Sequence, residues 1–299
     1  MKNPPGSLQR PYHNHRCFQA PGKDMNMRPA DFRFSHAHMV GFALFFAAIL
    51  LQFINVRFSV VPLTIFLLLC LVAPFLPRLS FFLPVVSRGT SGKRAVALTF
   101  DDGPDPSSTP ALLRLLSKYE TKATFFVTGK NASAHPELIA EILSQGHSIG
   151  NHSYSHDNFM MLKSSRILLR EIRSTQDILS QFDITPFAFR PPVGITNPRL
   201  GNVLQKLGMY NVNFTCRAMD GGNRWIKNLS KRILKRIRPN YIIALHDIKT
   251  GDDAGFSYWL NEIELVLSGI RERGLSIYPL AQLIGRPVMS TGENVVDQG

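Results

Sequence analysis

The sequence is poor in cysteine, and its cysteines are not spaced to bind a metal or to build a disulfide framework. Cys17, Cys70 and Cys216 are odd in number and far apart, and Cys70 lies in an apolar run where it is most simply a small hydrophobic residue. There is also no internal repeat, no glycine-rich phosphate loop and no recognition-helix, zinc-finger or aromatic ribonucleoprotein pattern. These absences disfavour a disulfide scaffold and a nucleic-acid-binding protein.

Acidic residues are scarce relative to basic ones. The 299 residues include 34 Lys and Arg against 21 Asp and Glu, which gives a formal net charge of +13. Such a balance suits an anionic membrane surface or an anionic polymer. The length and the 44% hydrophobic content predict one domain of ordinary size with an appendage.

Two apolar runs follow an N-terminal segment rich in Pro, His and Arg. Residues 1–38 show no apolar periodicity, which predicts a flexible basic tail. Residues 40–56 and 58–77 each approach the roughly 20 residues of one bilayer crossing, and Arg57, between them, is the only charge from residue 40 to 77. Two such runs in series disfavour a buried core helix. We therefore expect residues 39–77 to anchor the chain in the cell (inner) membrane as a helical hairpin.

Membrane topology follows from the basic residues on both flanks of the apolar runs. The tail is rich in Lys and Arg, and Arg78, Arg88, Lys93 and Arg94 follow the second run. By the positive-inside rule, a hairpin would leave the large domain facing the cytoplasm. A single crossing, with the other run lying in the interface, would place that domain outside, so the side of the membrane stays open.

From Ala95 onward the chain alternates strand-like runs with helix-like stretches. Alternation of this kind predicts a parallel sheet, and roughly seven units favour an α/β barrel of the (β/α)7 type over an open sheet. We expect residues 78–93 to be a linker, 94–285 the main folded domain and 286–299 a flexible tail. The predicted strands are Ala95–Phe100, Ala123–Thr128, Ser148–Asn151, Pro186–Arg190, Tyr210–Thr215, Tyr241–His246 and Ser276–Pro279.

Two adjacent carboxylates end the first of these strands. Asp101 and Asp102 follow the apolar run 96–100 and precede Gly103 and Pro104. Asp-Asp-Gly-Pro is good turn chemistry, so a plain turn and a functional site are about equally compatible with this stretch alone. Aspartates are poor strand formers, however, and active sites of strand–helix barrels gather at the carboxyl ends of the strands.

A histidine pair follows the strand Ser148–Asn151. His152 and His156 stand four residues apart, a spacing that puts both rings on one face of a helical turn, although a surface loop is the alternative. Two imidazoles and one carboxylate would leave open positions on a divalent ion, as catalytic sites do. Zn²⁺ is the plausible default, and the donor set also admits Co²⁺, Ni²⁺ or Mn²⁺.

Two further strand ends carry polar residues. Arg190 precedes Pro191 and Pro192 and could hold a carboxylate through its planar guanidinium. His246 ends the apolar run 241–245 and is a credible general acid. A proline-rich turn and a bystander histidine are the simpler interpretations of each cluster taken alone.

Together these clusters resemble the polysaccharide deacetylase family, the NodB-like carbohydrate esterases. The resemblance covers roughly residues 94–285 and keeps the order of the family's motifs, which are Thr99-Phe-Asp-Asp-Gly103, His152-Ser-Tyr-Ser-His156, Arg190-Pro-Pro-Val-Gly194 and Leu245-His246. It implies a distorted (β/α) barrel and metal-dependent hydrolysis of N-acyl amino sugars.

The resemblance also implies roles for individual residues. Asp101 is expected to be the general base, oriented by Arg190, and His246 the general acid, oriented by Asp220. The expected metal ligands are Asp102, His152 and His156, and the expected substrate contacts are Pro192, Val193, Trp225 and Leu245.

Two motifs depart from the family pattern. Val193 stands where the family usually has Tyr, so the backbone N–H remains available to an oxyanion but a ring contact to sugar is lost. The fourth motif usually reads Asp-x-x-Asp-Trp, whereas Asp220-Gly-Gly-Asn-Arg-Trp225 has an extra residue and lacks the second Asp. The altered motif indicates a substrate unlike that of well-studied members.

The expected function is therefore a membrane-anchored, metal-dependent hydrolase that removes N-acetyl or other N-acyl groups from a glycan and releases acetate. If the domain faces the cytoplasm, a deacylase or deformylase of a lipid-linked sugar fits better. A catalytically inactive glycan-binding relative is a third hypothesis, and retention of the acid–base residues argues against it.

Overall fold

The computed structural model describes residues 35–76, 78–218, 220–224, 226–249 and 251–292, so almost all of the predicted tail at residues 1–38 lies outside the described residues. The strands are β1 (Val85–Val86), β2 (Ala95–Asp101), β3 (Thr124–Val127), β4 (Ser148–Asn151), β5 (Ile184–Pro186), β6 (Ala188–Phe189), β7 (Tyr210–Val212), β8 (Cys216–Arg217), β9 (Ile242–His246), β10 (Ser276–Ile277) and β11 (Met289–Thr291). The helices are α1 (His36–Gln52), α2 (Val60–Val72), α3 (Ser108–Lys118), α4 (Gly129–Ala134), α5 (Pro136–Ser144), α6 (Ser165–Leu179), α7 (Pro198–Lys206), α8 (Leu229–Arg236), α9 (Asp253–Glu272) and α10 (Leu280–Ile284).

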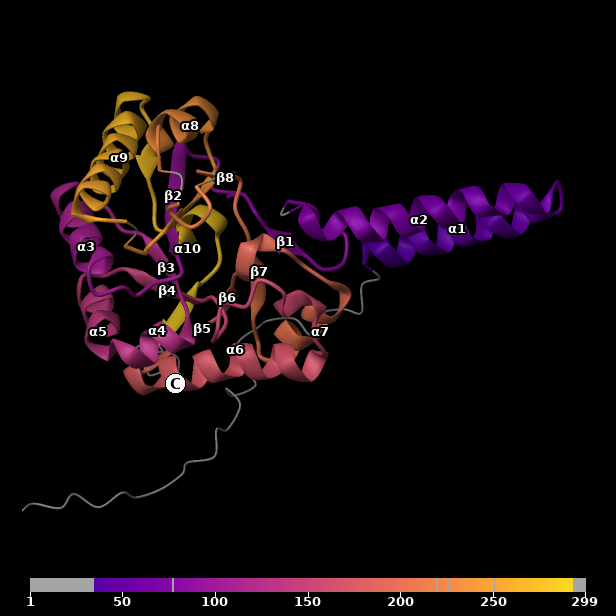
Figure 1. Cartoon of the computed structure of the whole chain (residues 1–299), viewed down its shortest axis with the longest axis horizontal. Helices are drawn as coiled ribbons and strands as arrows, with labels where there is room; N and C mark the ends of the chain where they lie inside the picture. The colour runs from indigo at the N-terminus through magenta and orange to yellow at the C-terminus, as the bar shows by residue number, and fades with distance from the viewer. Residues whose placement is uncertain (1–34, 77, 219, 225, 250, 293–299) are drawn as a thin grey trace, which may run out of the picture. The chain divides into compact units, whose positions relative to one another are not determined.

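A curled parallel sheet forms the centre of the domain, and helices pack around it (Figure 1). Its strand order is β1-β7-β6-β4-β3-β2-β9-β8, and β10 pairs with the beginning of β2. Within the described residues no ladder joins β8 to β1, and each of these edge strands has only two residues. The predicted parallel α/β fold is therefore confirmed, but the sheet is an open half-barrel rather than a closed barrel.

Strand β2 occupies the middle of the sheet because its sequence suits burial on both faces. All seven of its residues are buried, as expected for a strand of a parallel sheet covered by helices. It pairs with β3 on one side and with β9 on the other. This register places Asp101 beside His246.

Helix α6 shows how periodicity determines packing. Leu168, Ile172, Thr175 and Leu179 recur at helical spacing and are buried, so they form the apolar face of an amphipathic helix. Ile167, one position away from that face, remains 40% exposed.

The folded domain extends beyond its predicted boundaries at both ends. The predicted linker at residues 78–93 contains β1, which pairs with β7, and also buries Phe81 and Leu83. The predicted tail at residues 286–299 contains β11, which pairs with β5. Both strands are too short to show an alternating pattern in the sequence, and pairing with another strand defines them.

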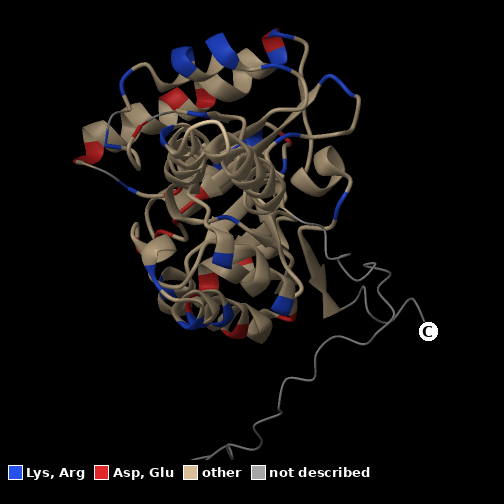
Figure 2. Cartoon of the chain, turned by 90° about the vertical axis from the view of Figure 1, so that its right-hand side faces the viewer, with Lys and Arg blue, Asp and Glu red and all other residues tan. Residues whose placement is uncertain are grey.

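The predicted anchor consists of two helices that run side by side, α1 and α2 (Figure 1). One stretch, Val56–Phe75, has the length and composition to cross a membrane, whereas His36–Gln52 is shorter. Arg57 is the only Lys, Arg, Asp or Glu between residues 36 and 75, so the pair is almost entirely tan in Figure 2. The structure thus gives one candidate span, and the hairpin crossing stays a prediction.

A pair of substitutions tests the packing of α6. Ile172→Ala is expected to lower the free energy of unfolding by about 2–5 kcal/mol, because a fully buried side chain is removed from the core. Ile167→Ala on the same helix is the matched control, with an expected change within about 0.5 kcal/mol. Urea unfolding of both variants in detergent would measure this, and equal destabilisation would contradict the assigned face.

Candidate active site

Three side chains from two strand ends converge on one point. Asp102 follows β2, and His152 and His156 follow β4. The Oδ1 atom of Asp102 lies 3.3 Å from Nε2 of His152 and 3.0 Å from Nε2 of His156. Neighbouring ligand atoms around a tetrahedral ion, each about 2.0–2.1 Å from it, lie roughly 3.3 Å apart. Both distances therefore match those between neighbouring ligands of one ion, and all three ligand atoms lie within 4.8 Å of one another.

The hydrogen bonds around this cluster also favour a cation. The Nδ1 atom of His152 donates to the carbonyl oxygen of Arg190 at 2.7 Å, which leaves Nε2 of the neutral ring with its lone pair directed at Asp102. Oδ1 of Asp102 is buried and accepts no hydrogen bond from the described residues. A carboxylate oxygen that faces imidazole lone pairs is stabilised by a positive ion between them. The donor set therefore fits a divalent metal with open positions for ligands.

Loop geometry, rather than a helix, brings the two histidines together. His156 has φ 52° and Ser153 has φ 67°, so the segment turns back on itself instead of continuing as the predicted helical turn. The imidazole centroids lie 4.9 Å apart. The backbone of Asp102 is also in the left-handed region, with φ 76°. Non-glycine residues rarely adopt this conformation, and such positions concentrate at functional sites.

A fully buried arginine fixes the first aspartate. The Nη1 atom of Arg190 donates to Oδ1 of Asp101 at 2.6 Å and to Oγ1 of Thr99 at 2.7 Å. The other guanidinium nitrogens donate to the carbonyl oxygens of Val212 and Asn213, each at 3.2 Å. Burial lowers the pKa of Arg190, and the Asp101 carboxylate opposes that change. One oxygen of Asp101 is thus occupied, and the other can accept a proton.

His246 forms the second acid–base pair of the site. Its Nδ1 atom lies 3.0 Å from Oδ1 of Asp220, which is itself buried. Burial alone would lower the pKa of His246, but the hydrogen bond and charge of Asp220, with smaller contributions from Asp102 and Asp101, raise it to about 9. His246 is therefore a cation at neutral pH, as a proton donor requires.

The sequence analysis assigned no role to Asp247, although it is fully buried beside the site. Its carboxylate accepts hydrogen bonds from the hydroxyls of Ser108 and Thr109, both at 2.6 Å. Burial raises the pKa of Asp247 to about 7. A Cβ added at Gly103 would lie 2.3 Å from Oδ2 of Asp247, so this packing requires glycine after the aspartate pair. The sequence signal that could have identified Asp247 is its position directly after His246, the histidine at a strand end.

The residue at the place of the fourth motif's second Asp also has a structural role. The side-chain amide of Asn223 donates to the carbonyl oxygens of His246 at 3.2 Å and Ile248 at 2.9 Å. This loop therefore holds the backbone around His246, while Asp220 holds its ring. In the sequence alone, this position is only a departure from the family pattern.

The residues predicted to contact substrate differ in how exposed they are. Val193 is 44% exposed and has φ 53°, whereas Pro192 is buried. Leu245 is completely buried in the main hydrophobic core, so its side chain packs in the core, and the contact with substrate stays a prediction. Trp225 lies outside the described residues.

The fold is thus a parallel α/β half-barrel with carboxylate, imidazole and guanidinium groups at its strand ends. Residues 88–212 match the family model described as polysaccharide deacetylase. The chain is 32% identical over 203 residues to a chitooligosaccharide deacetylase of Azorhizobium caulinodans, a match that covers 65% of this chain and 96% of the relative. It therefore belongs to the polysaccharide deacetylase family.

Two further comparisons agree with this assignment. A peptidoglycan-N-acetylglucosamine deacetylase of Bacillus cereus is 28% identical over 196 residues, which cover 65% of this chain and 90% of the relative. The crystal structure of the Bc1960 peptidoglycan N-acetylglucosamine deacetylase superposes with a TM-score of 0.62 at 27% identity, over 68% of this chain and 94% of that chain.

Metal analysis tests the assignment of the cluster. The purified protein is expected to retain about one divalent ion per chain after dialysis, and His152→Ala or Asp102→Asn should lose it, because each variant removes a donor atom. His135→Ala, which changes a histidine outside the cluster, is the control and should keep the ion. Mass spectrometry of the metal content would decide, and full occupancy in His152→Ala would refute the ligand set.

Proposed function

We propose that the protein hydrolyses the N-acetyl amide of an amino sugar in a glycan and releases acetate. The observation that carries this proposal is the position of the Asp102, His152 and His156 cluster beside two oriented acid–base pairs. The relatives named above are deacetylases of chitooligosaccharides and peptidoglycan, which supports an N-acetylglucosamine-containing substrate.

The three-donor cluster would hold a divalent ion, with Zn²⁺ the best fit to its donors and Co²⁺, Ni²⁺ or Mn²⁺ as other candidates. When bound, such an ion polarises the amide carbonyl and acidifies water. Asp101, oriented by Arg190, accepts the proton of the attacking water at its free carboxylate oxygen. The oxygen of that water forms the new bond to the carbonyl carbon, and the backbone N–H of Val193 donates to the developing oxyanion.

His246 completes the reaction at the nitrogen. Its Nδ1 atom is engaged by Asp220, so Nε2–H is the proton that can be transferred. Protonation of the leaving nitrogen accompanies cleavage of the carbon–nitrogen bond, because an amide anion is a poor leaving group. The products are the free amino sugar and acetate.

A second candidate substrate is an N-acylated sugar carried on a lipid. The loops that contain the site also display large exposed apolar side chains, with Phe159 69% exposed and Leu162 77% exposed. The amide of Asn197, beyond Val193, donates to the carbonyl oxygen of Met161 and links the two loops. An apolar rim of this kind suits a substrate presented at a membrane. The stretch Val56–Phe75 supports anchoring in the cell membrane, on a side that the chain does not determine.

An aspartate substitution tests the catalytic assignment. Asp101→Asn is expected to lower kcat/KM for a chitooligosaccharide by about 10²–10⁴-fold, because it removes the general base, while the metal content stays unchanged. Acetate release and metal content would be measured on the same samples. Asp177→Asn, an exposed site on α6, should behave as the wild type. Full activity of Asp101→Asn would contradict the proposed roles.

The pH profile tests His246. Because its pKa is raised to about 9, the acidic form persists through neutral pH, and kcat/KM should fall as the pH rises through about 9. In Asp220→Asn, the carboxylate no longer opposes burial, so the alkaline limb should move to lower pH. An unchanged limb in that variant, measured over pH 6–10, would refute the proposed pair.

A further inference from the structure

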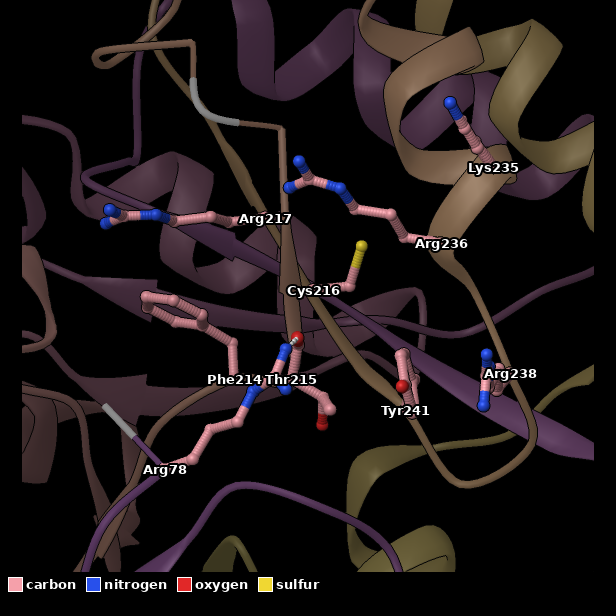
Figure 3. Close-up of a pocket in the computed structure, with 9 residues that line it drawn as sticks. All are labelled: Arg78, Phe214, Thr215, Cys216, Arg217, Lys235, Arg236, Arg238 and Tyr241. Atoms are coloured by element: carbon pink, nitrogen blue, oxygen red, sulfur yellow. Dashed lines mark hydrogen bonds between the residues drawn. The ribbon is translucent and has the colours of Figure 1, made fainter. Parts of the chain in front are cut away.

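A basic cavity of about 390 Å³ lies at the open side of the sheet and shares no residue with the metal-binding cluster. Figure 3 shows it between β8, the end of α8 and the residue before β9. Its cationic lining residues are Arg78, Arg217, Lys235, Arg236 and Arg238, and the others are Phe214, Thr215, Cys216 and Tyr241.

No acidic residue lines the cavity to balance its positive charge. Five lining residues are cationic and none is acidic. The ion pairs recorded among the described residues all involve other cations. Lys235 and Arg236 lie in the last turn of α8, where the helix dipole favours positive charge, but the other three cations come from separate segments. Like charges gathered in a concave site are stabilised by an anion.

Contacts with neighbouring groups orient two of these arginines. Arg78 donates through Nη2 to the carbonyl oxygen of Thr215. The Arg217 guanidinium lies 5.5 Å from the centroid of the Phe214 ring. Guanidinium groups held in this way can bind phosphate through paired hydrogen bonds, so four arginines and one lysine favour phosphate over an unspecific anion.

The position of Arg78 in the sequence indicates where the phosphate would come from. Arg78 is three residues beyond Phe75, the end of the apolar stretch Val56–Phe75. If that stretch spans the bilayer, Arg78 lies at the level of the lipid headgroups, where anionic phosphates are concentrated. This step depends on the proposed membrane anchoring.

We propose that this cavity is a binding site for the phosphate of an anionic lipid headgroup, separate from the catalytic centre. Headgroup binding at β8 and α8 would hold the domain against the bilayer beside its anchor. The group that binds is the phosphate, and anchoring would place the cavity where headgroup phosphates are concentrated.

Binding of short-chain lipids to the full-length protein in neutral detergent tests this proposal. Dioctanoyl phosphatidylglycerol is expected to bind at least about 10-fold more tightly than dioctanoyl phosphatidylcholine, whose phosphate is neutralised by choline, and than inorganic phosphate. The double variant Arg217→Gln, Arg236→Gln should lose that preference about 10-fold, while activity on a soluble chitooligosaccharide stays within about 2-fold of the wild type.

A matched double variant controls for net charge. Arg166→Gln with Arg173→Gln removes the same two charges from exposed positions of α6 and should bind phosphatidylglycerol as the wild type does. Equal affinity for the two lipids, or equal losses in the two double variants, would overturn the proposed site. Inorganic phosphate binding as tightly as phosphatidylglycerol would overturn the lipid as its source.

Flotation with phosphatidylcholine vesicles separates this proposal from the anchoring on which it depends. Failure of the wild type to float would refute anchoring, and with it the argument that places Arg78 at headgroup depth. Flotation without any preference for phosphatidylglycerol would leave anchoring intact and refute the cavity as a headgroup site.

Discussion

The buried guanidinium of Arg190 is the interaction on which the arrangement of the site depends. It joins β2 through Thr99 and Asp101 to β7 and the residue after it through the carbonyls of Val212 and Asn213. Its own carbonyl accepts from His152, so one residue positions both the proposed base and a proposed metal ligand. The centroid of the Phe126 ring lies 4.0 Å from the guanidinium carbon. A buried charge of this kind tolerates loss of its partner poorly, because the remaining charge would be left uncompensated.

Parallel pairing explains why groups so distant in the chain meet. The β2–β9 register sets Asp101 beside His246, and the β3–β4 register brings Asn151, just before His152, next to Val127. Each strand then ends at the same edge of the sheet. Loops with left-handed residues at Asp102 and His156 turn the side chains inward. The scaffold supplies alignment along the strands, and the loops supply the final direction of each group.

Much of this could be predicted because it depends on strong local signals. The buried run 95–101, the amphipathic face of α6 and the polar residues at strand ends are all visible in the sequence. The two-residue strands β1 and β8 carry no such signal, since pairing with neighbours defines them. The burial of Leu245 in the core is decided by tertiary contacts, which the resemblance does not describe. Asn223 acts through backbone carbonyl groups, which no residue pattern reveals, whereas Asp247 was visible as a charged residue directly after a strand-end histidine.

The shortness of the two edge strands has a further consequence. An unclosed sheet exposes rows of backbone donors and acceptors, and a long exposed edge can template pairing with another polypeptide. Here β1 and β8 offer only two residues each, too few to recruit a foreign strand. The protein can thus leave its barrel unclosed without inviting amyloid-like self-association.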